Sequence, residues 1–256
     1  MKTKIALTLT ALLSTSAFAH DSDGRHNSCD ININQSIKVT PAYVQILDGD
    51  KSLYRITDDS RLYAQGKRIH LNSEQQALVD EYRDLMQELA PQVAHLVTQG
   101  LDMAKDAVEQ VFTELFGDET QLQDKVQTIV AKFEDRIAPL IDEEAGEYYL
   151  PKDEIANGGE DLSREIESEV ETLMKESAGH MMVLIGKMML KGEGGMEDFE
   201  QKMEAFGESM EARGEALEKS AEAMCVKMEK LEVLETKMQK EIPEIAAFDL
   251  LKSQSI

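Results

Sequence analysis

The chain is poor in aromatic residues and contains no tryptophan. Aromatic side chains make up 5% of its 256 residues, whereas methionine occurs 14 times. This composition favours aliphatic and methionine-lined packing between helices over an aromatic-rich β core. Positive charge is also scarce, with 27 Lys and Arg against 50 Asp and Glu and a formal net charge of −23. Because so acidic a molecule repels nucleic acid and anionic lipid surfaces, we expect neither as a partner.

The chain contains no hydrophobic run of membrane-spanning length, and its most continuous apolar run lies within the first nineteen residues. There Lys2 and Lys4 precede a short apolar run and a small-residue motif that ends at Ala19. This order is typical of a secretory signal peptide, and the run is well short of the roughly 20 residues needed to cross a bilayer. We therefore expect residues 1–19 to be cleaved off before His20. The mature protein would be soluble, without membrane insertion, and its charge would be about −25 because two lysines are lost.

Only two cysteines are present, Cys29 and Cys225. In an exported protein an even number of cysteines indicates first of all a disulfide. Such a bond would close most of the mature chain, and the chain-entropy model then gives at most roughly 5 kcal/mol of stabilisation. Two free thiols, or a bond between two molecules, are the alternatives. The sequence contains no Cys-x-x-Cys redox motif.

Alternation of apolar and polar residues predicts a small antiparallel sheet in the first part of the mature chain. Turn-forming residues separate runs at 30–34, 37–39, 43–47, 51–56, 61–64 and 68–71. Period-two alternation is the pattern of a half-buried strand. We expect a β-meander with one apolar face, inside a β region that covers residues 20–72.

From Ser73 onward apolar residues recur every three or four positions, which predicts helices. Ser73 and Gln76 have the spacing of a capping box at the first helix start, and Gly117–Asp118 ends the apolar stripe of that region. Residues 142–161 are acidic and contain several turn formers, and we interpret them as a long loop. The expected fold is α+β, with a mainly helical region over residues 73–256.

A seven-residue apolar repeat runs through the last part of the chain. Its positions are Met196, Met203, Met210, Leu217, Met224, Leu231 and Met238. So strict a repeat predicts a long helix with a coiled-coil seam. The glycine-rich segment 192–195 separates this helix from an amphipathic one over 162–191. We expect the two to fold back on each other as a hairpin that spans residues 162–241.

With these elements the chain resembles the YggN-like family of exported proteins from Gram-negative bacteria, a domain of unknown function. The resemblance is carried by Cys29, Gly66–Lys67, Leu71, Gln75–Gln76, Phe206–Gly207, Cys225 and Lys230–Leu231–Glu232. It covers most of the mature chain. The resemblance implies a periplasmic location and a pairing of Cys29 with Cys225, and it carries over no catalytic residue.

No motif assembles a nucleophile, a base or a set of metal ligands, so we expect no catalytic residue and no cofactor. A long acidic helix with a methionine-lined face suits adaptable contact with other proteins. We therefore expect a non-catalytic periplasmic protein whose partner is another protein of the cell envelope. The alternative is a copper-binding protein, which would use the amine and imidazole of His20 and the soft sulfur atoms of the Met-rich helices.

Overall fold

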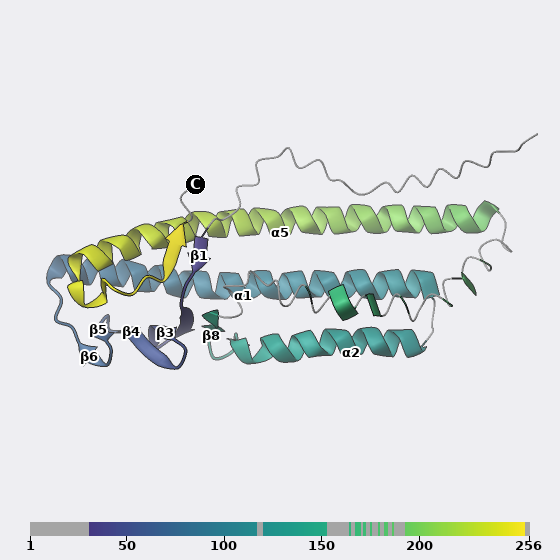
Figure 1. The fold of residues 1–256 in the computed structure, drawn as a ribbon. Helices are drawn as coiled ribbons and strands as arrows, with labels where there is room; N and C mark the ends of the chain where they lie inside the picture. The colour runs from purple at the N-terminus through teal and green to yellow at the C-terminus, as the bar shows by residue number, and fades with distance from the viewer. Residues whose placement is uncertain are drawn as a thin grey trace, which may run out of the picture.

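The chain folds as an antiparallel sheet at one end of a bundle of long helices (Figure 1). This computed structural model describes residues 31–116, 120–152 and 193–253, together with parts of 164–186. The α+β fold predicted from the sequence is confirmed. Among the described residues no helix is both long enough and apolar enough to cross a membrane.

The seven-stranded sheet contains the predicted meander. The strands of the described residues are β1 (Ile31–Ile33), β2 (Ser36–Thr40), β3 (Tyr43–Asp48), β4 (Lys51–Thr57), β5 (Leu62–Ala64), β6 (Lys67–Arg68), β7 (Ile141–Asp142), β8 (Glu147–Leu150) and β9 (Leu251–Ser253). Strand order in the large sheet is β6-β5-β4-β3-β2-β8-β7. Consecutive strands from β2 to β6 pair antiparallel, so alternation in the sequence located this part of the sheet correctly.

Two strand pairings differ from the prediction. β1 does not join the meander but pairs with β9 in a separate two-stranded sheet, with Ile31 opposite Ser253. The interpretation of 142–161 as a loop is wrong at its beginning, because β8 pairs with β2 and places Tyr148 opposite Val39. Both pairings join segments more than 100 residues apart. An alternation pattern marks a strand but does not reveal a partner so distant.

The long helices of the described chain are α1 (Ser73–Phe116), α2 (Thr120–Ile137) and α5 (Glu193–Glu241). α1 begins with a capping box one residue earlier than predicted. The side-chain oxygen of Asn72 accepts hydrogen bonds from the backbone N–H groups of Glu74 and Gln75, both at 2.9 Å. The Gln75 side chain accepts the Asn72 N–H in return, also at 2.9 Å. Gln76 is free of this role and reaches the sheet instead, where it donates to the backbone oxygen of Ser60.

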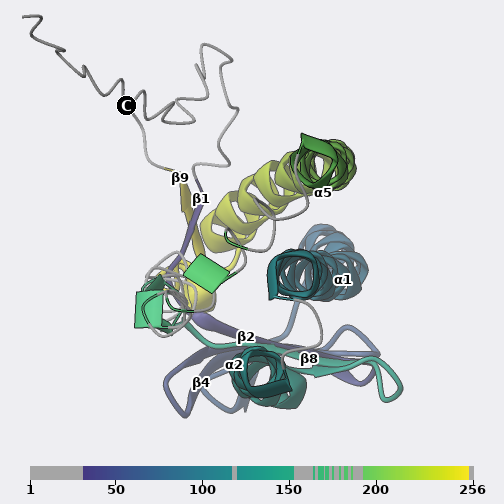
Figure 2. The same ribbon diagram turned by 90° about the vertical axis from the view of Figure 1, so that its right-hand side faces the viewer.

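The core lies between the sheet, the first half of α1 and the last part of α5. α1 and α5 lie side by side on one face of the sheet (Figure 2). Burial of the heptad positions decreases away from the sheet. Leu231 and Met238 are 3% and 1% exposed, whereas Met203 and Met210 are only half-buried. The seam of α5 therefore packs on α1. The predicted hairpin partner, residues 162–191, is described only in part, and the hairpin stays a prediction.

Candidate functional site

Most of the site residues predicted from the sequence lie outside the described residues. This holds for Ala19, His20 and Cys29. Cys225 is described and lies half-buried on α5. Because Cys29 is not among the described residues, its pairing with Cys225 stays a prediction. In the part of the chain that the structure describes, no group of three or more His, Cys, Asp or Glu residues could hold a metal ion.

A buried polar cluster lies where α5, α1 and the sheet meet. We call it the Glu235 cluster, and it consists of Tyr54, Tyr82, Glu235 and the backbone of Leu250 and Leu251. The Glu235 carboxylate is 3% exposed, and its two oxygens accept the N–H groups of Leu250 and Leu251, each at 2.9 Å. The Tyr54 hydroxyl donates to Glu235 at 3.5 Å and lies 3.0 Å from the Tyr82 hydroxyl. A side chain on α5 therefore fixes the segment that leads into β9.

Burial dominates the electrostatics of the Glu235 cluster. It raises the pKa of Glu235 from 4.5 to about 7, and the nearby charge of Asp249 adds to this rise. The N–H groups of Leu251 and Leu250 act the other way, because hydrogen bonds to a carboxylate favour its charged form. Burial also raises the pKa of both Tyr54 and Tyr82 well above the usual tyrosine value.

A shifted carboxyl pKa is a common sign of a catalytic acid. In the Glu235 cluster, however, both carboxylate oxygens already accept backbone N–H groups, and the carboxylate is shielded from solvent. A general acid must reach its substrate through a hydrogen bond. The geometry therefore assigns Glu235 to holding the chain segment around Leu250, a structural task.

Sequence reasoning missed Glu235, although a signal was present. Glu235 stands four residues after Leu231, three before Met238 and seven before Ile242, so it occupies the apolar stripe of its helix. All three of these neighbours are buried. A carboxylate on the buried face of a helix needs hydrogen-bond donors there. The pattern could have flagged Glu235 but not its donors, which come from the segment after the helix.

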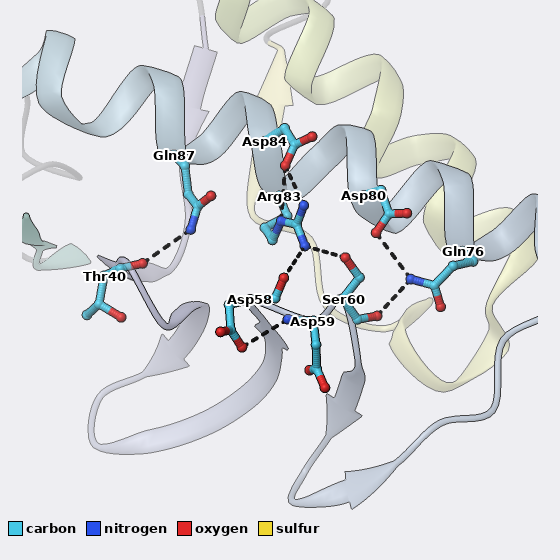
Figure 3. A network of polar contacts seen from close by, with 9 residues as sticks. All are labelled: Thr40, Asp58, Asp59, Ser60, Gln76, Asp80, Arg83, Asp84 and Gln87. Atoms are coloured by element: carbon cyan, nitrogen blue, oxygen red, sulfur yellow. Dashed lines mark hydrogen bonds and ion pairs between the residues drawn. The ribbon is translucent and has the colours of Figure 1, made fainter.

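A second polar network fastens α1 to the turns of the sheet (Figure 3). Arg83 donates to the backbone oxygen of Asp58 at 2.7 Å and to the hydroxyl of Ser60, and it pairs with Asp84 at 2.6 Å. Gln87, one turn further along α1, donates to the backbone oxygen of Thr40 at 3.3 Å. These bonds satisfy turn carbonyls, so the network orients the helix on the sheet.

Ion pairs connect α5 to α1 beside the apolar repeat of α5, from residues that lie three positions after Met210 and Met224. Lys227 contacts Glu88 at 2.6 Å, and Arg213 contacts Asp106 at 2.8 Å. The hydrogen bond from Lys227 and its charge lower the pKa of Glu88. These side chains are substantially exposed, so each pair adds little stability. The two pairs nevertheless set cations of α5 opposite carboxylates of α1, which favours one register of the two helices.

An apolar cavity of about 40 Å³ lies beside the two-stranded sheet. It is lined by Ile33, Ile37, Val39, Met86, Leu89, Ala90, Val93, Leu150, Met228, Leu231 and Leu251. Pockets that take small molecules measure roughly 300–1,000 Å³. This cavity is thus a packing defect rather than a ligand site.

A family model described as protein of unknown function, DUF2884, matches residues 29–251. The match runs from the predicted disulfide cysteine to the first residue of β9 and so includes all three long helices. Neither the curated proteins nor the solved structures contain a match to this chain. The resemblance to an unknown-function family inferred from short motifs is thereby confirmed.

Proposed function

We propose, from the premise that this chain belongs to the DUF2884 family of proteins of unknown function, that it is a non-catalytic periplasmic protein. In this proposal it acts by contact with another protein of the cell envelope. The signal-peptide pattern over residues 1–19 supports export. The support for protein contact comes from the outward face of α5.

The observation that carries this proposal is a pair of exposed valines on α5. Val226 and Val233 are 66% and 53% exposed and stand seven residues apart, so they lie on the same face of the helix. Their face is opposite the buried seam that contains Leu231 and Met238. Lys230, which pairs with Glu81 of α1 at 2.9 Å, stands between them on the helix surface. An apolar centre with a charged rim has the composition of a protein interface.

Site-specific cross-linking in intact cells tests this proposal. A photo-reactive amino acid at Val233 should give a discrete product with one envelope protein, identified by mass spectrometry. The same amino acid at Lys51, which is exposed at the start of β4, is the matched control. If the product forms equally from both positions, or from neither, the outward face of α5 is not a docking surface.

The alternative of copper binding is tested by measuring the metal content of the purified protein. Met203, Met210, Met224 and Met238 lie on the face of α5 that packs on α1, which favours packing as their role. Replacement His20→Ala then leaves the metal content unchanged. If the protein instead contains stoichiometric copper that is lost in this variant, metal binding becomes a better proposal than protein contact.

A further inference from the structure

The sheet has a second face that no described helix covers. α1 and α5 lie on one side of it in Figure 2. α2 overlaps the sheet there only in projection, because Figure 1 places α2 beyond the sheet along the long axis of the molecule. Side chains on this outer face alternate with the buried ones. Arg55, for example, stands between the buried Tyr54 and Ile56 and is itself partly exposed.

One row of side chains crosses six strands of this face in direct register. We call it the cationic row, and it consists of Arg68, Tyr63, Arg55, Gln45, Lys38 and Tyr149, on β6, β5, β4, β3, β2 and β8 in turn. Residues directly opposite each other in antiparallel strands point to the same face. Neighbouring strands lie about 4.8 Å apart, so the row is about 24 Å long.

Arg55 occupies the middle of the cationic row and is held by aromatic rings. Its guanidinium carbon lies 5.7 Å from the ring centre of Tyr43 and 5.5 Å from that of Tyr63. Within the described residues it has no carboxylate in ion-pair contact, whereas Lys38 pairs with Glu147 at 3.6 Å. A stacked guanidinium keeps its planar N–H edge available, which suits bidentate binding of a carboxylate.

The charge of this row is opposite to that of the molecule. The chain has a net charge of −23, but the cationic row contains three cations and no acidic residue. Glu147, next to the row, pairs with one of these cations, Lys38. Its remaining members are two tyrosines and a glutamine, which exchange hydrogen bonds with hydroxyl groups. The fully buried centre of a protein interface is mainly apolar. The row contains no aliphatic side chain, so its chemistry fits a hydroxyl-rich anion better than a protein surface.

We propose that the outer face of the sheet binds an acidic polysaccharide along the cationic row. Arg68, Arg55 and Lys38 stand on every second strand, about 10 Å apart. This spacing is close to the length of a disaccharide, so a glycan with a carboxylate on alternate sugars places one anion at each cation. The hydroxyl and amide groups between the cations hydrogen-bond the intervening sugars. This binding goes beyond the proposed protein contact, which involves the outward face of α5.

Calorimetric titration of the purified protein with three short polymers tests the class of ligand. The probes are a β-1,4-linked hexasaccharide that carries a uronic acid on alternate sugars, the neutral β-1,4-linked glucose hexasaccharide and hexaglutamate. We expect the uronic acid probe to bind at least tenfold more tightly than the other two. Its affinity should fall as salt is added, because exposed charges are screened. Equal binding of hexaglutamate would make the site one for acidic peptides, and equal binding of the neutral sugar would exclude charge recognition. Either result overturns the proposal.

Substitutions locate the binding on this face. Arg55→Gln should weaken binding of the uronic acid probe at least tenfold, and Arg55→Lys should recover part of the loss because it restores the charge without the planar group. Lys237→Gln removes the same charge from an exposed position of α5 and should leave the affinity unchanged. Arg68→Gln, on an exposed edge strand, gives the same test if Arg55→Gln does not fold. Affinity that is unaffected by both arginine substitutions would place the ligand elsewhere and overturn the proposal.

Discussion

At the scale of single residues, Glu235 combines a buried carboxyl group with two backbone donors from another segment. Its pKa of about 7, raised from 4.5 by burial, means that the folded protein holds a proton that the unfolded chain releases. The resulting stabilisation is fully present below pH 4.5 and is lost as the pH rises through 7. One pKa unit corresponds to about 1.4 kcal/mol, so the effect amounts to at most about 3 kcal/mol.

We therefore predict that the free energy of unfolding falls between pH 5 and pH 8. Urea denaturation at several pH values measures it. Glu235→Gln cannot titrate and should flatten this dependence. Its side chain has one oxygen instead of two, so one of the two backbone N–H groups loses its acceptor. Glu229→Gln, an exposed position on the same helix, is the control and should retain the slope. A slope that survives in Glu235→Gln would assign the pH dependence to the general negative charge of the molecule.

Tyr82 gives a second prediction at this scale. Removal of its hydroxyl in Tyr82→Phe leaves the buried Tyr54 hydroxyl with Glu235 alone, at 3.5 Å. We expect a loss of about 1 kcal/mol in unfolding free energy, the usual contribution of one buried hydrogen bond. Tyr63→Phe, on the partly exposed outer face of the sheet, should change it by much less. Equal losses in the two variants would show that the buried hydroxyl pair contributes nothing specific.

At the scale of elements, α5 divides into a tightly packed part and a loosely packed part. Leu231 is 3% exposed and faces the sheet end of the bundle, whereas Leu217 occupies the same heptad position two repeats earlier and is only half-buried. Leu217 contributes to the wall of a polar groove of about 230 Å³ between α1 and α5. The same sequence repeat thus produces different burial along one helix.

This difference predicts unequal costs for the same substitution. Leu231→Ala should destabilise the protein by about 2–5 kcal/mol, as for a leucine removed from a closed core. Leu217→Ala should cost less than half as much, because its site already opens to solvent. Chemical denaturation of both variants decides the point. Equal losses would mean that the distal half of the α1–α5 pair is as well packed as the half on the sheet.

The sequence predicted elements whose stabilising contacts are local or periodic. Alternation placed β2 to β5 within one or two residues, and the glycine at 117 marked the end of α1 at Phe116. It failed for β9, and for β8 in the acidic stretch, because each forms against a strand far away in the chain. Glu235 was missed for the same reason. Its donors belong to residues 250 and 251, and only the folded chain brings them together.

At the scale of the whole molecule, the strands β1 and β9 join the two ends of the described chain. Asn34 donates to the backbone oxygen of Leu250 at 2.8 Å beside the three paired residues of these strands. The predicted disulfide would join the same region, because Cys29 stands two residues before β1 and Cys225 lies on the helix that carries Glu235. Covalent and hydrogen-bonded closure would then reinforce each other.

The prediction at this scale concerns that disulfide. Mass mapping of the protein without reductant should recover a single peptide pair linked through Cys29 and Cys225. Reduction should lower the thermal midpoint, since the bond contributes at most roughly 5 kcal/mol. Serine replacement of both cysteines should reproduce the midpoint of the reduced protein. Free alkylation of both thiols without reductant, or linkage between two chains, would refute the intramolecular bond.

The pairing of β1 with β9 also determines when folding can end. Residues 31–33 lie at the start of the described chain, and their partners are residues 251–253. Contacts between such distant segments form late and slowly, because a long loop must close first. In the proposed export, with the N-terminal part leading, β1 would stay without its partner until almost the whole chain had crossed the membrane. A chain interrupted before Leu250 lacks both the strand partner of β1 and the backbone donors for Glu235.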